Sequence, residues 1–177
     1  MKAFEPGQGR KTAALRINFH VHFYYGVIIM NSKYMDLAYE EALKAFELEE
    51  VPVGCVIVKD DEILACTHNL KEKNNNSLDH AELLAIKEVS SKLNNWRLDD
   101  CDIYITLSPC PMCASAIKQA RIRNIYCGII NESYNFSLIK NILENTDNNS
   151  KCNIEVNLDK IRCGNLLKKF FKLRRFD

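Results

Sequence analysis

Apolar positions along the chain follow two periods, and these periods predict its helices and strands. Over residues 35–49 apolar side chains recur every three or four positions with acidic residues between them, which predicts a surface helix. Residues 51–58 and 63–67 are β-rich runs joined by the polar segment KDDE, which predicts a hairpin. Pro52 and Gly54 mark the start of its first strand.

The remainder of the chain alternates between strand and helix patterns. Residues 68–79 are rich in Asn and Lys without periodicity, which predicts a loop. The predicted elements after this loop are a helix over 80–93, a strand over 102–107, a helix that begins near Cys110 after two prolines, a strand over 124–130, a helix over 136–145, a strand over 153–157 and a helix over 159–175. This order predicts an α/β domain with a mixed sheet of about five strands and helices on both faces.

Composition narrows the class of protein. The chain of 177 residues is long enough for one domain, and 47% hydrophobic and 27% charged residues are typical of a globular protein. Because the net charge is only +1, any surface that binds nucleic acid must be local. Eight scattered cysteines favour buried thiols of a reducing compartment, and so a cytoplasmic protein, over a secreted disulfide scaffold.

Residues 1–34 are treated as an N-terminal extension, and the domain is placed at 35–177. Basic residues ahead of the short apolar run FHVHFYYGVIIM are typical of a targeting segment. The run is too short to span a bilayer, so no membrane association is expected. An alternative, which we favour, is that translation begins at Met30 or Met35. His20 and His22 alternate as strand neighbours do and could bind a metal, but no third ligand-type residue lies nearby.

Two predicted helix starts carry residues that bind metals. His80 lies in the first turn of one helix, and Cys110 and Cys113 lie at the start of the next. If the two helix N-termini meet, one nitrogen and two sulfurs converge, a donor set that suits Zn²⁺. Three ligands leave a position open for water, as in catalytic zinc sites. His68 or Cys101 could add a fourth ligand, but neither lies at a helix start.

Glu82 lies two residues beyond His80, where a carboxylate could reach the open position and move the protons of a bound water. A His beside a Glu is usually an ordinary helix start, so the pattern gains meaning only from the cysteines. HAE at 80–82 followed by PCPMC at 109–113 matches the H-x-E and P-C-x-x-C signature of zinc deaminases. The sequence therefore predicts hydrolytic deamination, with Glu82 as the catalytic proton carrier.

The chain from about residue 35 to 175 resembles the bacterial tRNA-specific adenosine deaminases. The resemblance is carried by EVPVG (50–54), HN (68–69), HAE (80–82), DIYITLSPCPMCASAI (102–117), RI (121–122) and FFKLRR (170–175). It implies the three-layer cytidine-deaminase-like fold, one Zn²⁺ per subunit and a homodimer. The implied reaction converts the wobble adenosine to inosine in the anticodon stem-loop of an arginine tRNA.

The same resemblance implies further site residues. Asn69 would hydrogen-bond the base, or else only cap a loop, and Val53 and Leu107 would wall the pocket, or else only fill the core. The basic and aromatic C-terminal segment would contact RNA through Lys168, Lys169, Phe170, Phe171, Lys172, Arg174 and Arg175. An amphipathic last helix with Phe170 in the core and solvated charges is the alternative for that segment.

Three departures from the family pattern fall around the substrate opening. NSLDHAE replaces the usual DPTAHAE, TLSPC replaces TLEPC, and NESYNFS replaces a glycine-rich stretch after the strand predicted over 124–130. TLSPC is also similar to fungal cytosine deaminases. A free nucleobase deaminase acting on cytosine or guanine is therefore an alternative, against which the basic C-terminal segment argues. A noncatalytic zinc-stabilised RNA-binding subunit is a third, against which Glu82 argues.

Overall fold

The computed structural model describes residues 19–145 and 152–174, with side chains described from residue 33 onward. Its elements, in chain order, are α1 (Phe19–Glu47), β1 (Gly54–Lys59), β2 (Glu62–His68), α2 (Ala81–Leu93), β3 (Asp102–Leu107), α3 (Pro111–Gln119), β4 (Asn124–Ile129), α4 (Phe136–Glu144), β5 (Asn153–Glu155) and α5 (Lys160–Leu173). This is the predicted order of helices and strands.

The strands form one mixed sheet in the order β2-β1-β3-β4-β5. β1 is antiparallel to both of its neighbours, whereas β3, β4 and β5 run parallel. β1 and β3 are apolar almost throughout because both of their faces are covered, as their burial shows. The prediction of a mixed sheet of about five strands is confirmed.

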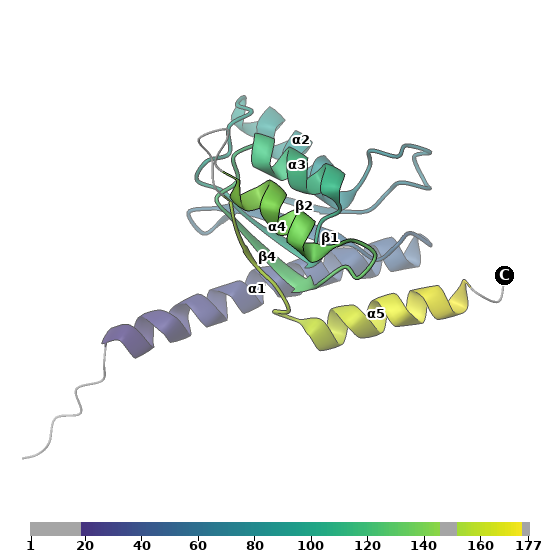
Figure 1. Ribbon diagram of the computed structural model, residues 1–177, viewed down its shortest axis with the longest axis horizontal. Coiled ribbons are helices and arrows are strands. Elements are labelled where there is room, and N and C mark those ends of the chain that lie inside the picture. The colour runs from purple at the N-terminus through teal and green to yellow at the C-terminus, as the bar shows by residue number, and fades with distance from the viewer. Residues whose placement is uncertain (1–18, 146–151, 175–177) are drawn as a thin grey trace, which may run out of the picture.

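Helices cover both faces of the sheet (Figure 1). α2, α3 and α4 lie on one face, where Val89, Ile117 and Ile139 pack with the strand residues Ile103 and Ile105 into the main core. On the other face α1 packs through a second apolar cluster, whose members are Tyr34, Met35, Ala38, Val56, Val58 and Tyr104. α5 lies beside α1 on this same face (Figure 1). The result is the predicted three-layer arrangement.

The first helix is longer than predicted. It begins at Phe19, well ahead of residue 35, and ends at Glu47. His20 and His22 therefore lie in a helix, and the expectation that they alternate as strand neighbours is wrong. An isolated strand needs a partner for its backbone groups, whereas a helix that has already formed adds one internal hydrogen bond per residue. The earlier residues, 1–18, lie outside the described part of the chain.

Across the ranges that the structure describes, none of the helices combines the length and apolar character needed to cross a bilayer.

The loops and helix starts that could form a functional site lie together at one edge of the sheet. Because β2 and β3 both run opposite to β1, their C-terminal ends lie at the edge where β1 begins. α3 begins a few residues after the end of β3, and the loop that follows β2 returns to the start of α2. The loops and helix starts at this edge can therefore share a single site.

α1 packs unusually closely on the start of β1. Gly54 has no side chain, and a Cβ there would lie 2.0 Å from the backbone oxygen of Ala38 and 2.5 Å from the backbone nitrogen of Ala42. The Gly54 N–H also donates to Thr106 Oγ1 at 3.1 Å, which ties β1 to β3. Only glycine permits this close approach of helix and strand.

We expect Gly54→Ala to lower the free energy of unfolding by about 3 kcal/mol or more, because neither backbone can move without disturbing the core. Gly164→Ala is the matched control: its Cβ would lie 3.1 Å from Ile129 Cδ1, the end of a flexible side chain, and alanine favours the helix by roughly 1 kcal/mol. Urea denaturation followed by circular dichroism measures both. Equal stabilities for the two variants would contradict this account of α1 packing.

Candidate active site

Two helix starts face each other at the edge where β1 begins. His80 is the residue just before α2, with extended backbone angles (φ −72°, ψ 148°), and Cys110 occupies the same position before α3. Pro111 follows at the first helical position, where its missing N–H costs no hydrogen bond. Cys113 lies within the first turn of α3. Both helices thus direct their positive ends toward one point.

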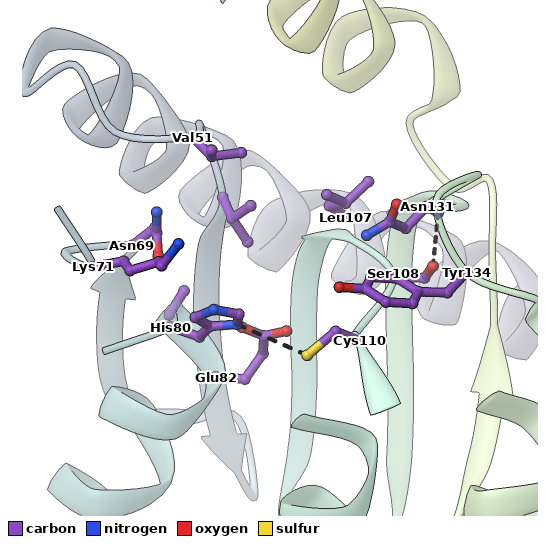
Figure 2. Close-up of a pocket in the computed structure, with 12 residues that line it drawn as sticks. Val51, Asn69, Lys71, His80, Glu82, Leu107, Ser108, Cys110, Asn131 and Tyr134 are labelled. Carbon is purple, nitrogen blue, oxygen red and sulfur yellow. Dashed lines mark hydrogen bonds between the residues drawn. The ribbon is translucent and has the colours of Figure 1, made fainter. Parts of the chain in front are cut away.

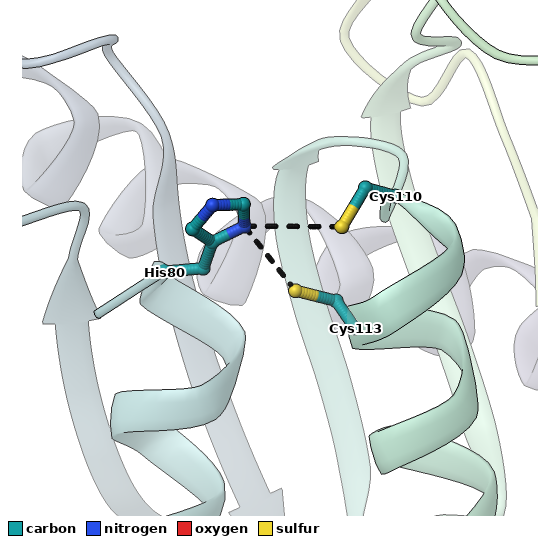
Figure 3. A group of neighbouring side chains, drawn as sticks. All are labelled: His80, Cys110 and Cys113. Carbon is teal, nitrogen blue, oxygen red and sulfur yellow. Dashed lines mark hydrogen bonds between the residues drawn. The ribbon is translucent and has the colours of Figure 1, made fainter. Parts of the chain in front are cut away.

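His80, Cys110 and Cys113 form a compact group (Figure 3). Their donor atoms all lie within 4.8 Å of one another; His80 Nδ1 is 3.4 Å from Cys113 Sγ and 3.9 Å from Cys110 Sγ. One imidazole and two sulfurs at this spacing fit Zn²⁺ and leave a fourth position free for water. The predicted convergence of the two helix starts is observed.

The two residues considered as a fourth ligand lie outside this group. His68 Nδ1 pairs with Glu41 Oε2 at 2.7 Å, which ties the end of β2 to α1. Cys101 precedes β3, whereas Cys110 follows it, so the two cysteines lie at opposite ends of that strand. The donor set therefore keeps the three members that an open, catalytic type of site requires.

Electrostatics in the group favours one thiolate. The pKa of Cys110 is lowered to about 4, chiefly by a hydrogen bond that the Cys113 thiol donates to it and also by the His80 side chain. The same bond, together with burial, raises the pKa of Cys113. The Cys110 side chain in turn raises the pKa of His80. A metal binds thiolates, so this environment prepares Cys110 to bind one.

Glu82 lies beside the group on the first turn of α2. Its side chain points into the space between His80 and Cys110 (Figure 2) and is only 4% exposed. Burial raises the pKa of Glu82, although the His80 charge and a backbone hydrogen bond oppose the change. A carboxyl group with a raised pKa is suited to accept a proton and then hand it on.

A pocket of about 240 Å³ opens above these side chains (Figure 2). Val53 and Leu107 line it, as predicted, and so does Asn69, which is nearly buried. The pocket also contains residues that the sequence interpretation did not single out: Val51, Lys71, Ser108, Asn131 and Tyr134. Ser108 lies in TLSPC, and Asn131 and Tyr134 lie in NESYNFS. Both segments depart from the family pattern, and this departure could have identified the three residues from the sequence.

Ser108 links two of the loops around this pocket. Its Oγ accepts the Asn131 N–H at 2.8 Å, and its own N–H donates to the Ile129 backbone oxygen at 2.8 Å (Figure 2 shows the former). The segment after β4 is thereby fixed against the end of β3. This bond positions Tyr134, a half-exposed aromatic ring, at the rim of the pocket.

The C-terminal helix divides the predicted RNA contacts into buried and exposed residues. Phe170 is 3% exposed and packs against Phe46, with ring centroids 6.0 Å apart, so it belongs to the core. Phe171 and Lys168 instead line a groove of about 600 Å³ that adjoins the pocket, because Val51, Leu107, Asn131 and Tyr134 line both. The remaining members of the predicted set are Lys169, Lys172 and Arg174, which are exposed, and Arg175, which lies outside the described residues.

Comparison with known proteins places this site in a family. The family model for the cytidine and deoxycytidylate deaminase zinc-binding region matches residues 29–129, which contain His80, Glu82, Cys110 and Cys113. The α/β fold, the His-Cys-Cys group and this match together define a zinc-dependent hydrolytic deaminase with Zn²⁺ as its cofactor.

Individual relatives show to which group within this family the chain belongs. The tRNA-specific adenosine deaminase of Streptococcus pyogenes serotype M1 is 37% identical over 143 residues, which cover 80% of this chain and 84% of that protein. A solved structure from a study of A-to-I editing by tRNA:A34 deaminases has a TM-score of 0.68 and 30% identity, and the match covers 77% of this chain and 99% of that one. The chain therefore belongs to the tRNA-specific adenosine deaminases, within the zinc-binding deaminase family.

A guanine deaminase structure from Bacillus subtilis is also similar. It has a TM-score of 0.54 and 33% identity, and the match covers 56% of this chain and 64% of that one.

We expect Cys110→Ala to lose zinc and stability together, because the free energy of metal binding contributes to folding. Removal of a direct ligand should weaken zinc affinity by more than about 100-fold, the upper range for residues that merely support ligands. Zinc is measured by mass spectrometry of the purified protein, and unfolding by thermal melting. Cys66→Ala, an exposed thiol on β2, is the control and should behave as wild type. Full zinc occupancy in Cys110→Ala would refute the ligand assignment.

Proposed function

We propose that this protein deaminates the wobble adenosine to inosine in the anticodon of a tRNA, and that this tRNA is an arginine tRNA. The observation that carries the proposal is that two hollows adjoin: the pocket above His80 and Glu82 and the groove beside α5 are lined in part by the same residues, Val51, Leu107, Asn131 and Tyr134. A free base needs only the pocket, whereas a nucleotide within RNA also needs room for its neighbours. The named relatives support the same substrate.

In this proposal His80, Cys110 and Cys113 hold the zinc ion. A zinc ion held there would supply a nucleophile at neutral pH, since it lowers the pKa of a bound water to roughly 7. Glu82 accepts a proton from the attacking water and delivers protons to the purine ring nitrogen and the leaving amine. Adenosine and water thus become inosine and ammonia, and Glu82 ends the cycle in its starting protonation state.

The pocket walls hold the base in this proposal. Val53 and Leu107 offer apolar surfaces to the two faces of a purine, and the Asn69 amide offers hydrogen bonds to its edge. Val53 is fixed because its backbone oxygen accepts the Asn69 N–H at 3.0 Å, which joins the two sides of the pocket. The apolar wall at Val53 and the amide of Asn69 would thereby be held together at the start of β1 when they recognise a purine.

The exposed part of the C-terminal set supports RNA binding. Lys168 and Phe171 line the groove that adjoins the pocket, and Lys169 and Lys172 are exposed on the same helix. Cations that contact phosphates and an aromatic ring that stacks on a base are the usual means of holding single-stranded RNA. Phe170, in the core, is left out of this proposal.

We further propose a homodimer and a cytoplasmic location. Leu78 and Met112 are exposed apolar side chains next to the helix starts of the site, where a second subunit would cover them. The eight cysteines, all in the described ranges, are free thiols and most are buried, which fits a reducing compartment.

Deamination of free guanine is the second candidate function. It is favoured by the similarity to the Bacillus subtilis guanine deaminase and by the altered segments TLSPC and NESYNFS around the pocket. A free base would leave the groove beside α5 without a purpose. The two candidates share the zinc chemistry and differ only in substrate.

We expect Glu82→Gln to keep its zinc and to lose turnover by about 10²- to 10⁴-fold, because glutamine has nearly the same shape but cannot carry the proton. Ammonia release and zinc content are measured on the same preparation. Glu88→Gln, an exposed residue of the same helix, should retain wild-type activity. Near-normal turnover in Glu82→Gln would eliminate the proposed proton transfer.

A direct comparison of substrates tests the proposed function itself. Purified protein is incubated with an arginine anticodon stem-loop that carries the wobble adenosine and, separately, with free guanine and free cytosine. We expect inosine from the RNA and no xanthine or uracil, because only the RNA occupies both the pocket and the groove. Product from a free base alone would keep the zinc chemistry and replace the tRNA assignment.

A further inference from the structure

Glu50 is a buried carboxylate beside the pocket for which the chemistry above has no use. Its side chain has no solvent exposure. Oε2 accepts a hydrogen bond from Asn69 Nδ2 at 3.0 Å, and Oε1 accepts one from the Lys73 backbone N–H at 2.7 Å. Complete burial of a carboxylate is costly unless its oxygens accept hydrogen bonds, and these two contacts offset that cost for Glu50.

The backbone that carries Glu50 is itself fixed. α1 ends in a Schellman arrangement, in which the Glu49 N–H donates to the Phe46 oxygen at 3.1 Å and the Glu50 N–H donates to the Ala45 oxygen at 2.9 Å. Glu49 adopts a left-handed conformation (φ 61°) to permit this turn. The Glu50 carboxylate is therefore held by the end of a helix that packs against the sheet.

This carboxylate determines which way the Asn69 amide faces. A carboxylate accepts hydrogen bonds only, so the Asn69 nitrogen must face Glu50. The Asn69 oxygen then lies on the side of the amide toward His80 (Figure 2). Without Glu50 the two ends of the amide, which have nearly the same shape, could exchange places, and the polarity presented to a substrate would reverse.

We infer that Glu50 is a positioning residue for deamination, which fixes the Asn69 amide in the one orientation that recognises the substrate. The inference rests on the proposed role of Asn69 in holding the base. Glu50 also accepts the Lys73 N–H, so it anchors the loop that carries Lys71, another residue of the pocket. Its two carboxylate oxygens accept from Asn69 and from the Lys73 backbone, and its effect on the substrate passes through Asn69.

Glu50→Gln is the sharpest change because it preserves shape. Glutamine offers one oxygen and one NH₂ group, and the Lys73 N–H requires the oxygen. The NH₂ group then faces Asn69 and forces its amide to turn over. The pocket keeps its volume and its residues, but the orientation of its amide is reversed.

A double-mutant cycle tests this inference with Glu50→Gln, Asn69→Ala and the two combined. We expect each single change to lower kcat/KM by about 10- to 100-fold, the effect of one hydrogen bond to a charged or substrate group. If Glu50 acts through Asn69, the double variant should fall no further than Asn69→Ala, within about twofold. Zinc content and thermal melting are measured on every variant, and Glu47→Gln, exposed at the end of α1, is the matched control.

Two outcomes would overturn the inference: wild-type kcat/KM in Glu50→Gln, or losses that multiply in the double variant, which would show that Glu50 acts independently of Asn69. If Glu50→Gln does not fold, Glu50→Asp, which keeps an acceptor but withdraws it by one methylene, takes its place in the cycle. Ammonia release is followed on whichever of RNA, guanine or cytosine the wild type deaminates. If the wild type deaminates a free base and not the RNA, the proposed function is overturned, but the test of Glu50 can still be carried out.

Discussion

The site depends on one constraint of the sheet: β1 lies between two strands that both run opposite to it. The start of β1 and the ends of β2 and β3 consequently share an edge, and the helices that follow begin there. A parallel β1 would have placed these chain ends on opposite sides of the domain. Cys110 and Cys113 lie 30 and 33 residues beyond His80 in the sequence. Their convergence with it is a direct result of strand direction.

α1 couples the stability of the domain to the shape of the pocket. Its small residues allow the close contact with Gly54, and this contact brings the end of the helix next to the start of β1. Glu50 follows that helix end and reaches Asn69 across the pocket wall. A change that loosened α1 would therefore disturb substrate recognition before it reached the metal-binding group, which α2 and α3 hold from the other face of the sheet.

Periodicity and ligand chemistry predicted most of this structure, because both are local properties of a sequence. Helical and alternating patterns placed the strands and helices, and two helix starts with metal-binding residues predicted their meeting. The start of α1 was missed because its aromatic and β-branched residues also suit a strand. Glu50 and Tyr134 were missed because their significance lies in contacts with distant segments. Adjacent aromatic residues, Phe170 and Phe171, could not be assigned to core or groove until the helix was placed.

The small size of the pocket has a consequence for the structure of the RNA. About 240 Å³ above the metal-binding group admits a single base, and its walls belong to the edge of a rigid sheet. A base stacked in a duplex cannot enter, so it must first swing out from its neighbours, at a cost of a few kcal/mol. This cost is lowest in a hairpin loop, where bases are already partly unstacked. Selection of the anticodon thus begins in the RNA, through the ease with which one nucleotide leaves its stack.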